Sequence, residues 1–78
     1  MRAAATRSNL GALLRIVGRY DEAETHLLES IRIFGRLGVP VRVLSPLMNL
    51  AELHEARGEW NDAEKRWSEM LRAATETG

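Results

Sequence analysis

Two histidines, His26 and His54, have the clearest capacity for metal binding or acid–base chemistry, since each has carboxylates close to it in the sequence. A carboxylate-bridged di-metal site in a helical bundle requires Glu-x-x-His motifs on facing helices. The residue three places before each histidine is instead an alanine, Ala23 or Ala51. We therefore predict no metal site, and we expect both histidines to be surface residues or to pack between helices.

Other patterns of catalysis and cofactor binding are missing from the sequence. The chain has no cysteine, which excludes disulfides, thiolate nucleophiles and zinc–thiolate sites. No serine has a histidine and an acid at a spacing that indicates a nucleophile, and the glycines are isolated rather than grouped in a phosphate-binding loop. The sequence predicts that the chain is not an enzyme and binds no cofactor.

The overall charge narrows the choice of partners. The 78 residues include eleven basic and eleven acidic side chains, so the formal net charge is zero. A dedicated nucleic-acid-binding domain normally carries a clear basic excess. No apolar run approaches the roughly 18 residues that a membrane-spanning helix needs, and the first residues lack the apolar stretch of a secretory signal. We expect a cytoplasmic protein that binds neither nucleic acid nor membrane.

Charge is arranged in blocks along the chain. Residues 1–19 contain four arginines and no acid, and an acidic stretch from Glu52 to Glu64 is interrupted only by Arg57. One interpretation is that charge alternates between neighbouring helices and helps them pair. The alternative is that the basic first block forms a patch that binds a partner.

The sequence repeats itself after forty residues. Aligning residues 1–38 with residues 41–78 gives ten identical pairs out of thirty-eight, without a gap. The identical pairs are Arg2/Arg42, Asn9/Asn49, Leu10/Leu50, Leu13/Leu53, Gly18/Gly58, Ala23/Ala63, Glu24/Glu64, Glu29/Glu69, Arg32/Arg72 and Gly38/Gly78. Two tandem copies of one structural unit explain this pattern.

Each unit is predicted to be two helices separated by a glycine. The predicted helices are residues 4–17, 20–37, 46–57 and 60–75. Gly18 and Gly58 end the first helix of each unit in the left-handed conformation that glycine adopts easily. The residues expected to face inward are Leu10, Leu13, Leu14 and Val17 in the first helix, and Ala23, Leu27, Ile31 and either Ile33 or Phe34 in the second. Ala73, near the end of the last helix, is expected to be exposed.

The start of the third helix depends on Pro46. A proline in the first turn of a helix is harmless, and Ser45 is then expected to be the N-cap. A start between Val43 and Ser45 is favoured. The alternative is a helix that begins near Val41 and kinks at Pro46, which would bury Val41, Val43 and Leu44.

The residue spacing in each unit resembles that of the tetratricopeptide repeat. That family shows W-x2-L-G-x2-Y in its first helix and A-x3-F in its second. The first unit reads Arg7-x2-Leu10-Gly11-x2-Leu14 and then Ala23-x3-Leu27, and the second reads Leu47-x2-Leu50-Ala51-x2-His54 and then Ala63-x3-Trp67. Gly18 with Tyr20, and Gly58 with Trp60, are similar to the family's glycine-x-aromatic turn.

The chain departs from the family pattern in three places. Arg7 stands where an aromatic is usual, both units lack the closing proline, and the period is forty residues rather than thirty-four. The longer period resembles the variant repeats of kinesin light chains and bacterial regulators, in which Asn-Leu-Ala or Asn-Leu-Gly opens each unit. The alanine-, arginine- and glutamate-rich composition indicates a bacterial source.

The resemblance implies an all-α fold of two tandem helix-turn-helix hairpins, a four-helix fragment of a right-handed α-solenoid. One domain, residues 1–78, would contain repeats at about 1–38 and 41–78. Gly11 and Ala51 are expected to be small because another helix crosses there, and Trp60 and Trp67 are expected to be the turn and core aromatics. The expected structural positions are Leu10, Gly11, Gly18, Tyr20, Ala23, Leu27, Leu50, Ala51, Gly58, Trp60, Ala63 and Trp67.

The resemblance also implies a protein–protein interaction module, in which the first helix of each hairpin lines a concave groove for a protein or peptide. The expected groove residues are Ser8, Asn9, Ala12, Arg15, Ile16, Met48, Asn49, Glu52 and Glu55. An asparagine amide both donates and accepts, so Asn9 and Asn49 suit the main chain of an extended peptide. The alternative is that each asparagine braces a neighbouring helix.

A second function remains open, in which the chain is a structural module that associates with itself. The outer face of the last helix, with Met70, Leu71 and Ala74, has no following hairpin in this sequence to cover it. The chain would then either form a homodimer through this face or belong to a larger bacterial regulatory or scaffold protein.

Overall fold

Four α-helices follow one another in the described part of the chain, which comprises residues 2–38 and 40–76 of a computed structural model. The elements are α1 (Arg2–Ile16), α2 (Tyr20–Arg36), the short 3₁₀ helix η1 (Pro40–Val43), α3 (Leu44–Ala56) and α4 (Trp60–Glu76). No strand occurs among these residues, and each helix boundary lies within two residues of its predicted position. The all-α prediction is confirmed.

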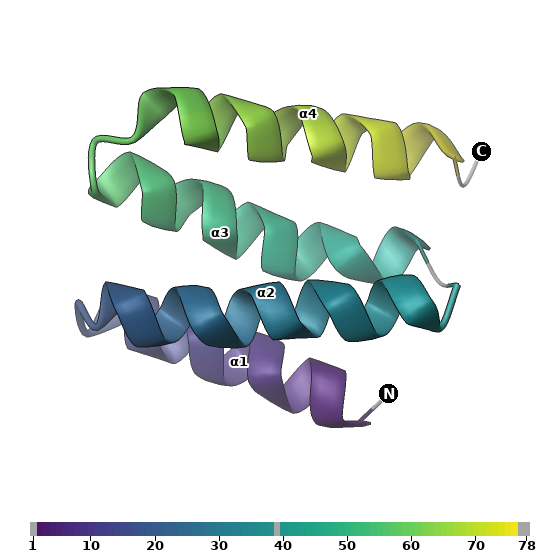
Figure 1. The fold of residues 1–78 in the computed structure, drawn as a ribbon, viewed down its shortest axis with the longest axis horizontal. Coiled ribbons are helices and arrows are strands. Elements are labelled where there is room, and N and C mark those ends of the chain that lie inside the picture. Colours follow the sequence, from purple (N-terminus) through teal and green to yellow (C-terminus); the bar gives the residue numbers. More distant parts are fainter. Residues whose placement is uncertain (1, 39, 77–78) are drawn as a thin grey trace.

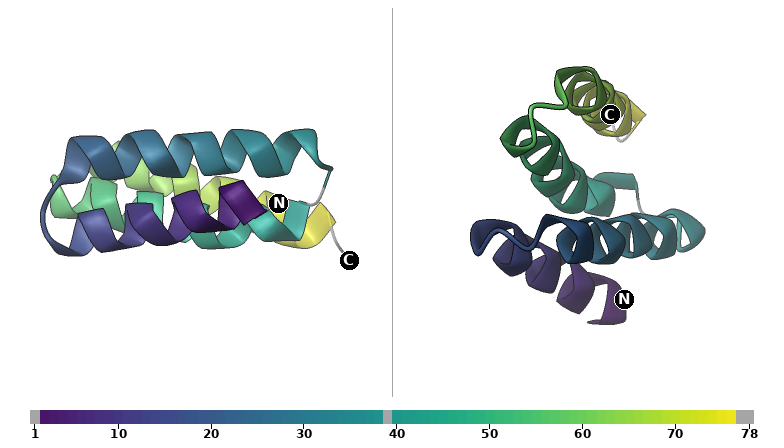
Figure 2. Two further views of the ribbon diagram at one scale, coloured as in Figure 1. Left: turned by 90° about the horizontal axis from the view of Figure 1, so that it is seen from below. Right: turned by 60° about the vertical axis from the view of Figure 1, so that its left-hand side comes forward.

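The helices form two antiparallel hairpins, α1 with α2 and α3 with α4 (Figure 1). Helix α3 packs against α2 and also contacts α1, so that it joins the second hairpin to both helices of the first (Figure 2). Helices α1 and α4 lie on opposite sides of the stack (Figure 1). The predicted arrangement of two tandem hairpins is confirmed.

The turn inside each hairpin is built in the same way. The glycines that end α1 and α3, Gly18 and Gly58, have φ values of 85° and 77°. In the first turn the Arg19 N–H donates to the Leu14 carbonyl at 2.8 Å, and the equivalent bond in the second turn is also 2.8 Å long. These bonds complete a Schellman ending, in which a left-handed glycine lets the chain satisfy the last carbonyls of the helix. The prediction for both glycines is confirmed.

Helix α3 begins at Leu44, inside the predicted interval, after the 3₁₀ turn η1. Pro46 is therefore in the first helical turn, where an N–H has no intrahelical acceptor, and its ring is fully buried. The prediction that Ser45 is the N-cap is wrong, because Val43 occupies that position and makes no side-chain capping bond. The alternative kinked helix is also wrong about Val41, which is exposed.

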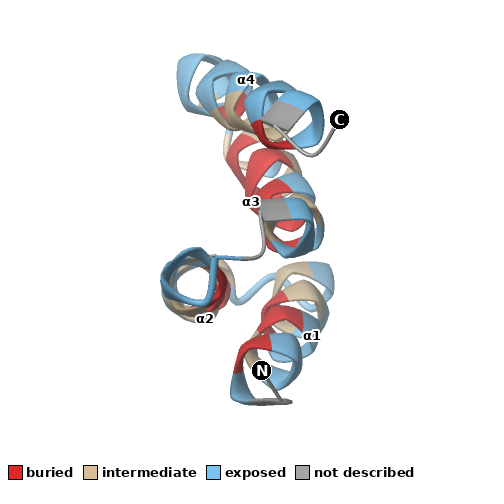
Figure 3. Ribbon diagram, turned by 90° about the vertical axis from the view of Figure 1, so that its right-hand side faces the viewer, coloured by how far each residue is buried: buried red, intermediate tan, exposed pale blue. Residues whose placement is uncertain are grey.

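The hydrophobic core joins the two hairpins. Its fully buried members are Ala23 and Leu27 of α2 and Leu50 and Leu53 of α3. Leu14, Tyr20 and Ile31 pack around this cluster. Figure 3 shows that buried residues concentrate on α3, whereas most of α4 is exposed.

The predicted inward stripe of α1 is wrong for three of its four residues. Leu10, Leu13 and Val17 are exposed, and only Leu14 is half-buried. The buried positions of α1 are instead small residues, Ala4, Ser8 and Gly11. Helix α2 approaches α1 so closely that large side chains do not fit between them, and the large apolar residues are displaced to the outer side. Ala73 was also wrongly expected to be exposed, since it is buried.

The close approach of α1 and α2 gives a testable prediction at Gly11. A Cβ atom there would lie 2.7 Å from the Leu27 side chain and 3.3 Å from the Ala23 carbonyl oxygen. Gly35 in α2 is the matched control, because a Cβ atom at that helical position meets nothing within 4 Å. Alanine favours a helix by about 1 kcal/mol over glycine, but overpacking a core typically costs about 1–3 kcal/mol.

We therefore expect Gly11→Ala to lower the free energy of unfolding by about 1–3 kcal/mol relative to Gly35→Ala. Urea denaturation followed by circular dichroism measures both values. Equal gains in stability for the two variants would show that α1 and α2 do not cross closely at Gly11.

Candidate functional site

A small cavity lies where the first half of α1 meets the start of α3. Its volume is about 170 Å³. The residues that line it are Ala5, Ser8 and Asn9 of α1, Phe34 of α2, Arg42 of η1, and Ser45 and Pro46 of α3. Pockets for drug-sized ligands and cofactors are about 300–1,000 Å³. The size of this cavity therefore fits one side chain of a larger partner better than a complete small molecule.

The two asparagines of the predicted groove have different environments. Asn9 is exposed at the cavity, and its side chain has no hydrogen-bond partner within the described residues. Asn49 is only 9% exposed. Its amide donates to the Ser45 carbonyl at 3.0 Å and its oxygen accepts from the Arg15 guanidinium at 3.3 Å. Asn49 thus braces α3 and links it to α1, whereas the Asn9 amide is exposed to solvent.

Arg15 connects α1 to α3. Besides its bond to Asn49, its guanidinium lies 3.4 Å from the Glu52 carboxylate. Arg15, Glu52 and Glu55 are all predicted groove residues, and the structure brings Arg15 into contact with the first of these carboxylates. An anionic partner group at Arg15 would have to displace Glu52, so Arg15 serves the contact between the two hairpins.

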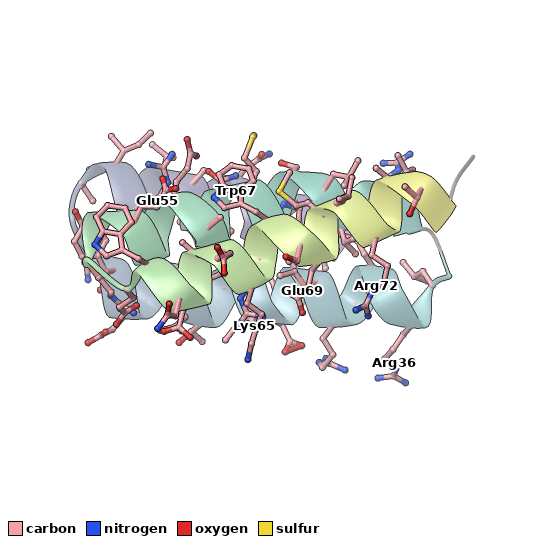
Figure 4. All side chains as sticks on the ribbon, turned by 90° about the horizontal axis from the view of Figure 1, so that it is seen from above. Arg36, Glu55, Lys65, Trp67, Glu69 and Arg72 are labelled. Carbon is pink, nitrogen blue, oxygen red and sulfur yellow. The ribbon has the colours of Figure 1, made fainter. Side chains whose placement is uncertain are left out.

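Glu55, the other groove acid, pairs with a residue that was not expected in the groove. The indole N–H of Trp67, on α4, donates to the Glu55 carboxylate at 3.2 Å. Figure 4 shows both side chains together on the side of the molecule where α1 lies, whereas Lys65 and Arg72 point towards the α2 side. Trp67 was expected to be a core aromatic, which is wrong because it is 39% exposed. The signals in the sequence for this position were its aromatic type and its spacing from Ala63 in the repeat motif.

The remaining predicted groove residues do not gather at one point. Ser8 is buried at the wall of the cavity, and Ala12 is half-buried further along α1. Ile16 and Met48 are both exposed. The structure thus brings together two polar groups, one at the cavity around Asn9 and one around Arg15, and leaves two apolar side chains uncovered.

Comparison with known proteins adds one finding. A family model described as tetratricopeptide repeat matches residues 2–76. The chain belongs to the tetratricopeptide repeat family. Repeats of this family generally mediate protein–protein interaction. Neither the search of curated proteins nor the search of solved structures gave a match. Throughout residues 2–38 and 40–76, every helix is too short or too polar to cross a membrane.

The two tetratricopeptide repeats use their structural positions unequally. Residues buried between helices at these positions are Gly11, Ala23, Leu27, Leu50, Ala51 and Ala63. The turn aromatics are less enclosed, because Tyr20 is half-buried and Trp60 is largely exposed. The same repeat position is therefore a core residue in one repeat and a surface residue in the other, depending on the neighbouring helices.

An ionic clamp between the two repeats was not predicted. Arg57, which is 17% exposed, donates from its two terminal nitrogens to Glu24 at 2.9 Å and to Asp21 at 2.6 Å. Its guanidinium carbon also lies 5.9 Å from the centre of the Tyr20 ring. The hydrogen bond with Glu24 is the main influence that raises the pKa of Arg57. Charge-assisted bonds of this kind have defined geometry, so the clamp fixes how the second repeat sits on the first.

Both histidines take part in packing between helices or turns. His26 accepts from Arg7 of α1 at 3.4 Å. His54 is buried, and its Nδ1 donates to the Glu59 carboxylate at 2.8 Å. Asp62 lies near this pair, and His54, Glu59 and Asp62 each offer one possible metal-ligand atom within 4.8 Å of the other two. The Arg57 guanidinium lies 3.8 Å from Glu59, and its positive charge opposes a cation at this place.

Proposed function

We propose that this chain binds an extended segment of a partner protein across the first half of α1 and the start of α3. One side chain of the partner would enter the cavity, and the partner's main chain would bond to the amide of Asn9. The observation that carries the proposal is the cavity of about 170 Å³ with an exposed amide at its edge that bonds to no described residue.

The chemistry of the cavity indicates which partner segments would fit. Its lining combines apolar groups from Ala5, Phe34 and Pro46 with the polar side chains of Asn9 and Arg42. A small apolar side chain suits the first set. A main-chain carbonyl or a carboxylate suits the second, because an amide N–H and a guanidinium are both donors. The preferred segment is therefore an extended one with a small apolar residue and an acid near it.

The test is the effect of Asn9→Ala on a peptide selected from a random library with the wild-type chain. Loss of a net hydrogen bond of about 0.5–1.5 kcal/mol should weaken binding about three- to tenfold. Melting should be unchanged, because the Asn9 side chain bonds to nothing in the described part of the chain. Titration calorimetry and thermal melting measure the two effects.

Two further variants complete this test. Asn61→Ala removes an exposed amide from α4 and should leave peptide affinity unchanged. Asn49→Ala should instead lower the melting temperature, because it removes the bonds to Ser45 and Arg15. The proposed site is wrong if the selected peptide binds Asn9→Ala as tightly as the wild type.

A further inference from the structure

Two apolar surfaces remain open at opposite sides of the stack. The α1 outer face consists of Leu10, Leu13 and Val17, of which Leu13 is 60% exposed. The α4 outer face consists of Trp60, Trp67 and Leu71, of which Leu71 is 68% exposed.

The internal repeat shows what kind of helix the α1 outer face can bind. Leu10 and Leu13 correspond, at the forty-residue spacing, to Leu50 and Leu53 of α3. Those two residues are fully buried where α3 packs on α2. The α1 outer face therefore presents the same two leucines that bind an α2-type helix inside the molecule.

The α4 outer face is the counterpart of the surface on α2 that receives α3. Tyr20, Leu27 and Ile31 of α2 belong to the core cluster or pack against it. The residues of α4 at the same repeat positions are Trp60, Trp67 and Leu71. All three are large and apolar, and Ala63 of the same helix is the identical counterpart of Ala23. Helix α4 therefore presents a surface of the type that binds an α1 or α3 helix.

The charges of the two ends are complementary. Helix α1 carries three arginines and no acid, whereas helix α4 carries four acidic and three basic side chains. Opposite charge on two surfaces favours their encounter and fixes their orientation. These net charges favour a contact between α1 of one copy and α4 of another over a contact between two α1 helices, which are both basic.

The contact between two copies would also contain a hydrogen-bonding pair equivalent to one that joins the two hairpins within a copy. Inside the molecule Arg15 donates to the Asn49 oxygen. The repeat counterparts of these residues are Glu55 and Asn9. With α4 of one copy against α1 of the next, the Glu55 carboxylate would face the Asn9 amide, which is again an acceptor opposite a donor.

We propose that copies of this chain stack head to tail, with the α4 outer face of one copy against the α1 outer face of the next. The head-to-tail stack brings two different surfaces together. It therefore differs from the symmetric homodimer through the last helix, which was an alternative left open by the sequence. Such a heterologous interface leaves one free face at each end, so the assembly grows with concentration instead of stopping at two copies. The proposal goes beyond peptide binding and does not depend on it.

The test uses two variants that each block one face, Leu13→Glu and Leu71→Glu. Both positions are well exposed, so both variants should retain wild-type helicity by circular dichroism. Analytical ultracentrifugation at up to about 1 mM should show a wild-type mass that rises with concentration and two variants that remain monomeric. An equimolar mixture of the variants should form a one-to-one dimer with twice the monomer mass, because each variant supplies the face that the other lacks.

Leu37→Glu is the control, because Leu37 is an exposed leucine at the end of α2 and belongs to neither face. It should associate like the wild type. The proposal is overturned if the mixture contains no dimer, or if Leu13→Glu alone dimerises, which is the result that a symmetric contact through α4 gives. A wild-type chain that stays monomeric at every concentration also overturns it, and a different protein would then be the occupant of the two faces. Peptide binding by Asn9→Ala is measured at dilutions where the chain is monomeric, so the two proposals fail separately.

Discussion

Replacing Leu50 with alanine is expected to lower the free energy of unfolding by about 2–5 kcal/mol, the usual range for a buried leucine. Leu50 is fully buried and lies in the cluster that joins α2 to α3. The loss would be severe, since a domain of this size has a total stability of about 4–12 kcal/mol at roughly 0.05–0.15 kcal/mol per residue. Chemical denaturation of the wild type and the variant measures the difference.

The control for Leu50→Ala is Leu10→Ala, the identical residue one repeat earlier. Leu10 is 40% exposed, so truncation removes less buried surface and leaves no closed cavity. We expect a loss below about 1 kcal/mol when the chain is dilute enough to be monomeric. Equal losses for the two leucines would contradict the finding that the hairpins meet through α3 and not through the outer side of α1.

The second large effect is expected at Ala23, where α2 meets both α1 and α3. Ala23 is fully buried in the core cluster. Ala23→Leu adds three carbon atoms where neighbouring atoms already touch, and overpacking of this kind typically costs about 1–3 kcal/mol. Ala63→Leu, at the counterpart position in α4, should behave in the same direction because Ala63 is also buried.

Ala56→Leu is the appropriate control for these alanine substitutions. Ala56 is exposed at the end of α3, and leucine and alanine are both good helix formers there. Urea denaturation should show a much smaller change for Ala56→Leu than for Ala23→Leu. If Ala23→Leu is tolerated equally well, the helices around Ala23 are further apart than the structure places them.

The helices and turns could be predicted from the sequence because their determinants are local. Gly18 and Gly58 supply a backbone conformation that other residues adopt at a cost, and helices must end there. The aromatic and acidic residues that follow each glycine start the next helix. Because the sequence repeats after forty residues, predicting one helical hairpin also predicts the second.

The inward face of α1 could not be predicted in this way, since burial depends on which helix lies alongside. Leu10 and Leu50 are the same residue at the same repeat position, yet one is exposed and the other is buried. Apolar periodicity identifies the stripe on which both leucines lie. It does not tell whether a preceding helix is present to cover that stripe, or that α1 meets α2 through Gly11.

In the candidate site, too, the sequence indicated the residue positions, whereas the contacts between distant residues came only from the structure. The asparagine position was visible in both repeats, but only the structure shows that Asn49 bonds to Ser45 and Arg15, while Asn9 makes no side-chain bond within residues 2–38 and 40–76. The clamp made by Arg57 joins residues more than thirty positions apart and has no local pattern. Its one signal was that Arg57 is the only basic residue in the acidic stretch from Glu52 to Glu64.

The positions of the start of α1 and the end of α4 determine how the four helices would respond to tension. The start of α1 and the end of α4 lie at the same end of the stack, on opposite outer sides (Figure 1). A load applied to these two points acts across the helix axes, so it peels α1 from α2 and α4 from α3 one turn at a time. Only a few contacts bear the load at any moment, whereas pulling along the axes would strain every contact of a hairpin together. If each of these two points were attached to an anchored protein, the chain would therefore lengthen gradually at low force.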